Sequence, residues 1–348
     1  MSPARIVAFD ILQKVGLGGY ASDLLIKHTA GLDPRDAGLA SEIVFGSLRY
    51  QAQLDHLINC FVPRRPDPEI RLILRMGIYQ LRYLDRIPAH AAVSESVELA
   101  KRARKQSATG LVNAVLRKVD RKPLAWPDQA TELSTPAWLI EKWTRQFGAE
   151  TSEKIAATFL RPVESYTAST GRIQDISAQS VVPHLDLHAG MTFLDLCAAP
   201  GNKTAQALEG GVRAIACDIH LHRLKDMGEL DCPLVVLDGT EPLPFRTQFD
   251  RILVDAPCSG TGTLGRNPEI KWRLQPSDLL PLHRKQVALL RNAIQYLKPG
   301  GRLVYATCSL EEEENRLVIQ AVPGRWELTE RLPGVDPGDG FFVAVLTS

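Results

Sequence analysis

The sequence lacks several features that would place it at once in a class of proteins. Its six cysteines form no C-x-x-C pair, which argues against both a zinc site and a disulfide framework. No apolar run is long enough to span a bilayer, and the N-terminus has no secretory apolar core. The turn Asp195–Thr204, which follows the first predicted strand, lacks the second glycine of a G-x-G-x-x-G motif and a Walker-type lysine, which disfavours dinucleotide and ATP sites there. We therefore expect a cytoplasmic protein with no metal and no membrane partner.

The charge is nearly balanced over the 348 residues but unevenly distributed. Residues 1–125 contain 19 Lys and Arg against 12 Asp and Glu, a net charge of +7, and residues 126–348 contain 22 against 28, a net charge of −6. This asymmetry predicts that the first part binds a polyanion, although ordinary surface charge would also explain it. Four basic residues at a predicted helix end, here called the basic cluster, either bind phosphates or only suit the helix dipole: Lys101, Arg102, Arg104 and Lys105.

The first third of the chain reads as a helical bundle. Apolar residues recur at helical spacing from residue 4 to residue 119, which predicts six or seven helices and no strands. Residues 126–173 then form a connector, in which we expect one helix over residues 137–160. A polar stretch over residues 161–171 shows no pattern of regular structure.

The second half alternates strands and helices. We expect strands over residues 193–196, 214–218, 234–238, 252–255 and 302–306, with helices between most of them. Such alternation is typical of an α/β domain with a mostly parallel sheet that helices cover on both faces.

The ends of the first three predicted strands carry residues suited to a nucleotide-type ligand. Small residues fill the turn Asp195–Thr204, where the backbone can approach a ligand closely. Asp218 and Asp238 end the next two strands, where carboxylates accept hydrogen bonds from a ribose or a base edge. Without the motifs of dinucleotide and ATP sites, this pattern favours S-adenosylmethionine. Helix capping by the two acids is the alternative.

Two cysteines follow predicted strands. Cys258 comes after Asp255-Ala256-Pro257, and Cys308 follows the strand that runs to Ala306. Because the carboxyl ends of parallel strands share one edge of a sheet, both thiols should face the same crevice. The alternative is that both are small buried apolar residues, which is common for a free cysteine.

Several segments resemble known families. Residues 74–81, 87–93 and 110–117 are similar to NusB-like RNA-binding domains. The later segments resemble the RNA 5-methylcytosine methyltransferases, and with the helical part in front they are most similar to the Fmu/Sun (RsmB-like) group that modifies bacterial small-subunit ribosomal RNA. The motifs that carry this second resemblance are residues 174–180, 195–201, 255–260, 266–272, 307–309 and 339–342.

The resemblance implies an α/β protein with an N-terminal all-α NusB-like bundle over 1–125, a connector over 126–173, and a Rossmann-like class I S-adenosylmethionine-dependent methyltransferase domain over 174–348. It implies methyl transfer to C5 of a cytosine in RNA, most simply 16S ribosomal RNA, by a monomer. Cys308 is then the nucleophile that adds to C6, Cys258 assists its release, Asp255 binds the cytosine edge, and Lys203 lines the site. The residues expected at the cofactor are Cys197, Ala198, Ala199, Pro200, Gly201, Asn202, Lys203, Asp218, Arg223, Asp238 and Asp255.

Other details of the motifs lead to further expectations. Ser309 and Glu312 have capping-box spacing, which predicts a helix directly after Cys308 with residues 311–314 as its solvated first turn. Trp272 lies either near the target base or in a core. Asn202 replaces a glycine of the family motif, and asparagine tolerates a left-handed backbone.

The space that holds an additional RNA-binding segment in the Fmu/Sun group is reduced here to residues 161–173. The target therefore stays open: another RNA such as tRNA, a non-RNA substrate of a class I methyltransferase, or an RNA-binding protein without activity.

Overall fold

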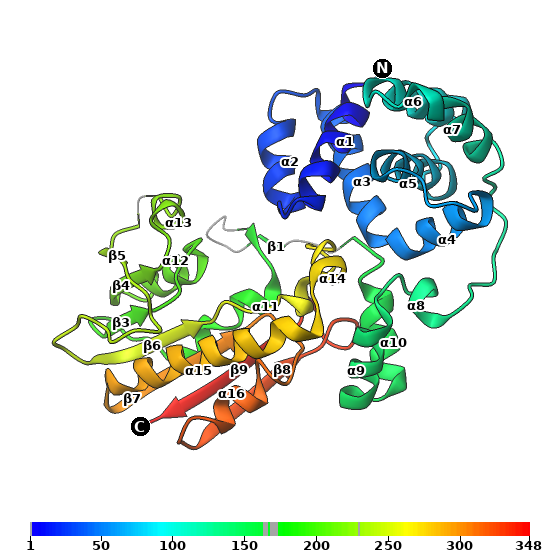
Figure 1. Cartoon of the computed structure of the whole chain (residues 1–348). Helices are drawn as coiled ribbons and strands as arrows, with labels where there is room; N and C mark the ends of the chain where they lie inside the picture. The colour runs from blue at the N-terminus through cyan, green and yellow to red at the C-terminus, as the bar shows by residue number, and fades with distance from the viewer. Residues whose placement is uncertain (1, 163–165, 168–172, 229) are drawn as a thin grey trace. The chain divides into compact units, whose positions relative to one another are not determined.

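The computed structural model describes residues 2–162, 166–167, 173–228 and 230–348. The chain forms two compact units. Figure 1 shows their helices and strands, coloured by residue number from blue at the N-terminus to red at the C-terminus. The helical unit comprises Met1–Pro162 and Gly265–Trp272, and the sheet unit comprises Val163–Leu264 and Arg273–Ser348. The division into three parts, with bounds at residues 1–125, 126–173 and 174–348, stays a prediction. Among the described helices, none combines the length and the hydropathy of a membrane-spanning segment.

The helical unit begins with seven α-helices in its described residues, within the range that the sequence predicts, and continues with three more. Their bounds are α1 Pro3–Gly16, α2 Ala21–Thr29, α3 Pro34–Arg49, α4 Gln51–Phe61, α5 Pro68–Tyr83, α6 Ala89–Arg102, η1 Gln106–Ala108, α7 Thr109–Leu116, α8 Gln129–Glu132, α9 Ala137–Phe147 and α10 Ala149–Thr158. Asp33 caps α3 by accepting from the backbone N–H of Arg35 at 2.9 Å, and Pro34 occupies its first turn.

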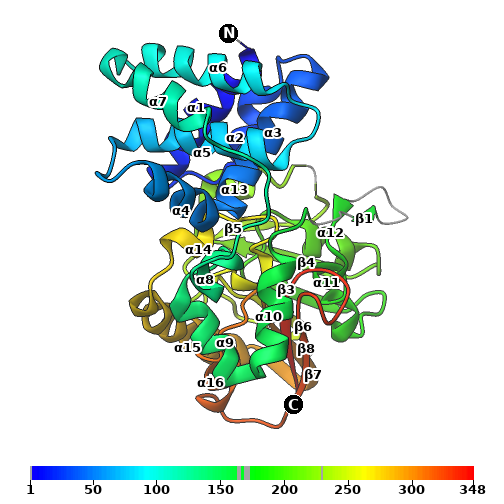
Figure 2. The same ribbon diagram turned by 90° about the vertical axis from the view of Figure 1, so that its right-hand side faces the viewer.

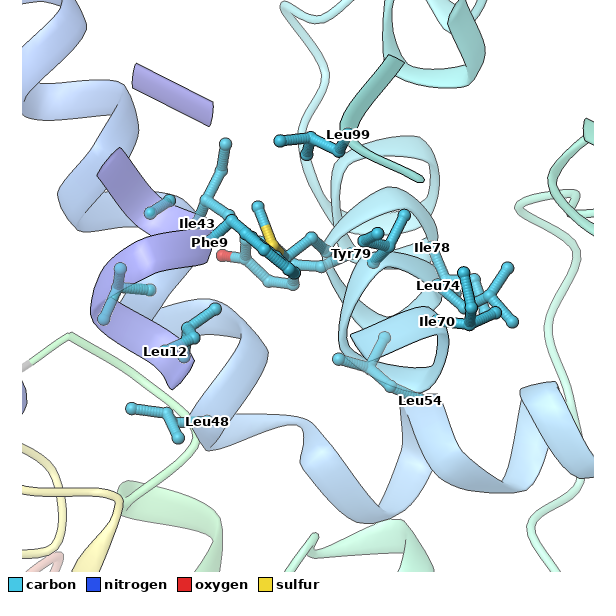
Figure 3. Close-up of a cluster of buried hydrophobic side chains, with 14 of the residues drawn as sticks. Phe9, Leu12, Ile43, Leu48, Leu54, Ile70, Leu74, Ile78, Tyr79 and Leu99 are labelled. Carbon is cyan, nitrogen blue, oxygen red and sulfur yellow. The ribbon is translucent and has the colours of Figure 1, made fainter. Parts of the chain in front are cut away.

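One apolar core joins the helices α1 to α7. Figure 3 shows part of this core, with Phe9, Ile43 and Leu74 among the buried side chains. Tyr79 of α5 packs against Gly46 of α3, where a Cβ atom would lie 1.8 Å from the ring carbon Cζ. The periodic apolar residues of the sequence therefore form the core of a bundle, as predicted.

The single helix expected over residues 137–160 is wrong. The chain forms two helices, α9 and α10, which lie side by side in both views (Figure 1, Figure 2). They are separated at Gly148, whose φ of +83° lies in the left-handed region. The apolar pattern gave no sign of the break because the buried positions continue on both sides of it, at Trp143 and Ile155.

The sheet unit is built on a seven-stranded sheet in the order β5-β4-β3-β6-β7-β9-β8. The strands β3 to β7 are parallel, and β9 pairs antiparallel with both β7 and β8. The strands of this sheet are β3 Thr192–Asp195, β4 Arg213–Asp218, β5 Leu234–Val236, β6 Phe249–Asp255, β7 Leu297–Thr307, β8 Trp326–Arg331 and β9 Phe341–Thr347. The predicted parallel strands are confirmed, but the sequence reading missed β8 and β9.

Helices pack on both faces of this sheet. Ile252 and Val254 of β6 point to the core formed with α15 and α16, whereas Leu253 belongs to the core with η2 and α12. Strands buried on both faces read as continuous apolar runs, which is why they were recognisable. The helices along this part of the chain are α11 Ile176–Gln179, η2 Val182–Leu185, α12 Asn202–Leu208, α13 Leu221–Lys225, η3 Thr261–Thr263, α14 Ile270–Arg273, η4 Pro276–Asp278, α15 Leu279–Gln295 and α16 Arg316–Gln320.

The stretch over residues 161–171 is not wholly without regular structure. β1 Tyr166–Thr167 pairs antiparallel with β2 Ile173–Gln174, in register Tyr166 to Gln174 and Thr167 to Ile173. Residues 163–165 and 168–172 lie outside the described residues, and for them the expected lack of regular structure stays a prediction.

The helical unit also contains Gly265–Trp272, which lies between two parts of the sheet unit in the chain. The indole Nε1 of Trp272 donates to the Leu48 carbonyl at 2.7 Å. The Lys271 ammonium, only 1% exposed, donates to the Arg49 carbonyl at 3.1 Å. Of the two roles considered for Trp272, the structure shows packing in the helical unit. Nothing in the sequence pattern indicated that this segment would leave the sheet unit.

Candidate active site

The candidate site lies at the carboxyl edge of the parallel strands. Here β3, β4 and β6 end in Asp195, Asp218 and Asp255, and β7 ends one residue before Cys308. The edge carries a cavity of about 280 Å³, whose lining includes acidic, apolar and thiol side chains. This is the place where open α/β sheets bind ligands.

Seven of the eleven residues expected at the cofactor line this cavity: Cys197, Ala199, Lys203, Asp218, Arg223, Asp238 and Asp255. The other four, Ala198, Pro200, Gly201 and Asn202, lie in the same turn after β3 but do not line the cavity. The predicted turn thus joins β3 to α12 at the edge of the cavity, while the direction of each side chain depends on backbone angles that the sequence pattern does not reveal.

Gly201 rather than Asn202 takes the left-handed backbone of this turn. Gly201 has a φ of +98°, and Asn202 is the first residue of α12. A Cβ atom on Gly201 would also lie 3.1 Å from the side chain of Met227. The asparagine that replaces the family's glycine therefore lies at a helical position, where it does not have to adopt a left-handed backbone.

Asp218 and Asp238 both line the cavity, and each accepts from the backbone N–H two residues further on. Neither caps a helix among the described residues, because α13 begins without a side-chain cap and the first described helix after Asp238 is η3. Asp218 accepts from the N–H of His220 at 2.9 Å and lies 3.6 Å from the guanidinium of Arg223. Asp238 accepts from the N–H of Thr240 at 2.9 Å, and its hydrogen bonds with Thr240 lower the pKa of its carboxyl. Each carboxylate has lone pairs beyond these bonds that can accept from a ligand.

The side chain of Asp195 stabilises the turn between β3 and α12. It is 1% exposed and accepts from the hydroxyl of Thr204 on α12 at 2.7 Å. Burial raises the pKa of its carboxyl to about 7, against the lowering effect of the Thr204 hydrogen bond. This contact ties the end of β3 to the first helix of the site.

Lys203 and Asp255 form an ion pair within the cavity. The ammonium of Lys203 lies 2.6 Å from Oδ2 of Asp255 and 5.3 Å from the centroid of the Phe341 ring. Burial alone would lower the pKa of Lys203, but the charge of Asp255, its hydrogen bond and the charge of Cys308 together raise that pKa. Lys203 therefore stays charged and places a cation near the Cys308 sulfur.

The two strand-end cysteines meet at this edge. Their Sγ atoms are 3.4 Å apart, although the residues are 50 positions apart in the chain. A hydrogen bond with Cys308, followed by burial and by the charges of Cys308 and Glu314, raises the pKa of Cys258 well above its ordinary value. The prediction that both thiols face one crevice is supported by this geometry, and both line the cavity.

The helix expected directly after Cys308 is wrong. Helix α16 begins only at Arg316, and the Ser309 hydroxyl accepts from the N–H of Glu311 at 3.0 Å instead of capping a helix. The solvated first turn is wrong as well, because Glu311 and Glu314 are both 0% exposed. A run of four glutamates is typical of a solvated surface, so the sequence alone gave no reason to bury two of them.

The sequence reading also missed several cavity residues. Lys285 of α15, His220 and Ile219 also line the cavity, and Ile219 is 42% exposed. Ile219 and His220 follow Asp218 directly, so their position next to a strand end was the available signal. Lys285 sits on an amphipathic helix, where no local pattern separates it from an ordinary surface lysine.

The basic cluster lies in the helical unit at the end of α6. Three of its members pair with acids: Lys101 with Glu98 at 2.6 Å, Arg102 with Asp10 at 3.5 Å, and Lys105 with Asp67 at 2.7 Å. Within the described residues, Arg104 has no such partner and is exposed. Among all the residues that the structure describes, no group of three or more His, Cys, Asp or Glu side chains is arranged to hold a metal ion.

The strand order, with β9 inserted antiparallel beside β7, and the acids at successive strand ends define a class I methyltransferase domain joined to a helical domain. Family models agree with both parts. Residues 182–331 match the model described as 16S rRNA methyltransferase RsmB/F, and residues 2–121 match the NusB family.

Relatives match over almost the whole chain. The ribosomal RNA small subunit methyltransferase B of Vibrio cholerae is 32% identical over 100% of this chain and 98% of its own length. That of Cronobacter sakazakii is 33% identical, over 98% and 97%. The chain belongs to the ribosomal RNA small subunit methyltransferase B family. The alignment with the Vibrio cholerae protein runs over 430 positions, so that relative has segments with no counterpart in these 348 residues.

Solved structures share the fold. The crystal structure of PH0851 has a TM-score of 0.81 at 21% identity and covers 100% of this chain and 99% of its own. A methyltransferase homologue from Pyrococcus horikoshii has a TM-score of 0.53 at 23% identity, covering 64% of this chain and 100% of its own. These likenesses concern the fold alone.

Proposed function

We propose that this protein transfers a methyl group from S-adenosylmethionine to C5 of a cytosine in RNA, with 16S ribosomal RNA as the substrate. The observation that carries the proposal is the pair of thiols, Cys258 and Cys308, 3.4 Å apart beside the acid-lined cavity. Family membership supports the choice of RNA, since the bacterial relatives are named for ribosomal RNA of the small subunit. A cytoplasmic location, where bacterial ribosomes are made, belongs to the same proposal.

The residues of the cavity fit S-adenosylmethionine. Asp218 is 5% exposed yet reaches the cavity, so it can accept from hydroxyl groups with little competition from water. Ile219 and Leu237 offer apolar surface for a base, and Asp238 lies at the next strand end. When bound, the cofactor supplies an electrophilic methyl group on a sulfonium. Acidic side chains around the cavity suit its positive charge.

Cys308 acts first on the cytosine. C5 of cytosine is too weak a nucleophile to accept a methyl group unaided. Addition of the Cys308 thiolate to C6 forms a C–S bond and moves electron density to C5, which then takes the methyl group. Lys203 and Cys308 line the same cavity, and the lysine charge interacts with that of the sulfur. Asp255 holds Lys203 in place, and in the proposal it also binds the polar edge of the base.

Cys258 assists the last step, in which C5 loses its proton and the bond between Cys308 and C6 breaks. The charge of Cys308 is among the causes that raise the pKa of Cys258. That cause disappears while Cys308 is bonded to C6 and returns when Cys308 leaves as a thiolate. In the adduct, where that cause is absent, Cys258 gives up its own proton, and its thiolate then takes the C5 proton directly or through water as Cys308 leaves C6.

The RNA must present an unstacked cytosine to such a cavity, because C5 and C6 of a stacked base inside an RNA helix are out of reach. We assign part of the RNA affinity to the basic cluster of the helical unit. Three of its four side chains must exchange an acidic partner for a phosphate, so each contributes less than a free cation would.

The test is transfer of label from radioactive S-adenosylmethionine by the purified full chain. 16S ribosomal RNA, tRNA and a protein extract are offered separately, and bisulfite sequencing then locates the modified base. Label in 16S ribosomal RNA at a bisulfite-resistant cytosine supports the proposal. Label only in tRNA replaces the substrate, and label only in protein, or in no acceptor, overturns the proposal.

A further inference from the structure

We propose that Glu314 is a positioning residue for both cysteines: its buried carboxylate holds Ser259 and Ser309, the residues that directly follow Cys258 and Cys308, and thereby fixes the distance between the two sulfurs. The inference rests on the proposed function, because it assumes that both thiols act on the substrate. Neither motif resemblance nor the run of glutamates in the sequence assigned a role to this residue.

The carboxylate of Glu314 receives four hydrogen bonds. Oε1 accepts from the N–H of Ser259 at 2.8 Å and from Nε2 of Gln286 at 2.9 Å. Oε2 accepts from the hydroxyls of Ser259 and Ser309, the latter at 2.5 Å. All of these groups are buried, with Glu314 and Gln286 at 0% exposure. An ionised carboxylate is an acceptor only and can take this number of donors, so its capacity is used in full.

These contacts connect the loops close to the thiols. Gln286 also donates to the Pro257 carbonyl at 3.0 Å, so the residues on both sides of Cys258 are joined to the same carboxylate. The hydroxyls of Ser259 and Ser309 are 3.1 Å apart. A second link, from the N–H of Gly262 to the Cys308 carbonyl at 2.9 Å, joins the two backbones. Glu314 is the charged group that both cysteine loops share.

The position of Glu314 is itself firmly held. The hydroxyl of Tyr305, on the strand that leads to Cys308, donates to the Glu314 backbone carbonyl at 2.6 Å. The next residue, Asn315, donates from its side chain to the Ser309 carbonyl at 2.8 Å. The carboxylate is therefore supported by rigid groups, which is what a residue needs in order to fix the geometry of others.

Removal of a buried acceptor of four donors should misplace the thiols, since a shift of about 1 Å at a reacting atom costs about 100-fold in rate. Glutamine has the same shape, and its amide oxygen can still accept from the Ser259 N–H and from Gln286. Its NH2 group is a donor, however, so the hydroxyls of Ser259 and Ser309 must reorient to accept from it. We therefore expect Glu314→Ala to slow single-turnover methyl transfer about 100-fold and Glu314→Gln about tenfold. Glu312→Gln, at an exposed position of the same loop, is the matched control.

Four measurements on the full chain separate positioning from a general structural role: the single-turnover rate, the affinities for S-adenosylmethionine and for RNA, the melting temperature, and the yield of covalent adduct in a Cys258→Ala background. Positioning predicts a slower rate and slower adduct formation with both affinities within about twofold of wild type. Ser309→Ala, which removes one donor, should fall between wild type and Glu314→Gln. If Glu314→Ala does not fold, the other two variants carry the test.

The inference is overturned if folded Glu314→Gln and Ser309→Ala transfer methyl groups at the wild-type rate, or if their affinities fall in step with their rates. Failure of the proposed function looks different, because Cys308→Ser would then be active or the wild-type protein would label no RNA. The wild-type and Cys308→Ser arms are therefore run beside the Glu314 series.

Discussion

The two cysteine loops start alike and end in different surroundings. Each follows a parallel strand, β6 or β7, each places a serine after its cysteine, and both serines bind Glu314. Yet Cys258 faces the negative charge of Glu314, whereas Lys203 places a positive charge near Cys308. Charges of opposite sign therefore lie beside the two equivalent sulfurs, and in the proposed function this difference accompanies the different roles of the two cysteines.

The loops also differ in where the chain goes next. After Cys308 it remains in the sheet unit, where Glu314 and α16 follow. After Cys258 it passes through η3 and then contributes Gly265–Trp272 to the helical unit. Only the Cys258 loop is therefore continuous with the unit to which we assign RNA affinity.

The largest effect expected is that of Cys308→Ser. A serine hydroxyl at this position does not supply a thiolate, so methyl transfer should be abolished while affinity for S-adenosylmethionine is unchanged. Label transfer and calorimetry check the two halves. Cys60→Ser, at an exposed cysteine of the helical unit, is the control. Transfer by Cys308→Ser near the wild-type rate would remove the division of roles.

Cys258→Ala should have the opposite signature at the same edge. Addition by Cys308 proceeds, but resolution is slow, so a covalent protein–RNA adduct accumulates. A denaturing gel with labelled RNA detects it as a shifted band. Absence of the band, under conditions where wild-type protein turns over, would show that Cys258 has no part in release and that the two loops are not complementary.

Asp218→Ala tests whether the cofactor depends on the acids and not on the cysteine loops. Loss of hydrogen bonds to a charged acceptor costs roughly 1.5–3 kcal/mol, or about tenfold to 100-fold in affinity. Calorimetry should show this loss, with adduct formation by the Cys258→Ala variant still possible. The exposed Asp226 of the same region provides the control variant, Asp226→Ala. An unchanged dissociation constant for Asp218→Ala would place it outside the site.

Much of this arrangement is legible in the sequence because it depends on local pattern. Buried parallel strands give apolar runs, and the residues after them share one edge of the sheet, so strand order alone predicts that the thiols and acids lie together. The antiparallel strands β8 and β9 were missed, and β8 is mostly half-exposed or exposed, so it carries no clear apolar run. The left-handed Gly148 inside one apolar pattern divided a predicted helix in two.

What the sequence did not reveal depends on contacts between distant residues. Glu314 is buried because donors from Ser259, Gln286 and Ser309 converge on it, and these lie 5 to 55 positions away. The run of glutamates that contains it looks like solvated surface. Segment 265–272 enters the helical unit through partners more than 200 positions away, which no local periodicity encodes.

Lys271 permits a test of that segment through pH. Burial, followed by the charge of Arg49, lowers its pKa in the folded chain to about 7, against an ordinary value of 10.5. Between these values the unfolded chain binds more protons, so the free energy of unfolding should rise with pH. Lys271→Met should therefore be more stable than wild type at pH 6, by a few kcal/mol, with the difference shrinking toward pH 10.

Urea titrations followed by circular dichroism at several pH values measure this difference. Lys118→Met, at an exposed position of the helical unit, should show no such trend. A constant difference between Lys271→Met and wild type over the same range would mean that Lys271 is not buried as a neutral amine, and that the continuation of the Cys258 loop is more loosely held than its contacts indicate.

The smallest effect concerns the basic cluster of the helical unit. Each phosphate contact on a single strand adds roughly −0.7 to the slope of log affinity against log salt. Because three of the four residues already pair with acids, replacing all four by Ala should flatten the slope by about one unit, near the effect of one or two contacts. Arg104→Ala alone should account for about 0.7 of it, since Arg104 has no acidic partner among the described residues.

Filter binding to 16S ribosomal RNA over a range of salt concentrations provides the slope, and calorimetry confirms that the affinity for S-adenosylmethionine is unaffected. Lys101→Ala is the matched comparison for Arg104→Ala, because it removes the same charge from the same helix end but breaks an ion pair with Glu98. If the fourfold variant keeps the wild-type slope, other cations hold the RNA. The passage of the chain from the Cys258 loop into the helical unit would then have no connection with RNA affinity.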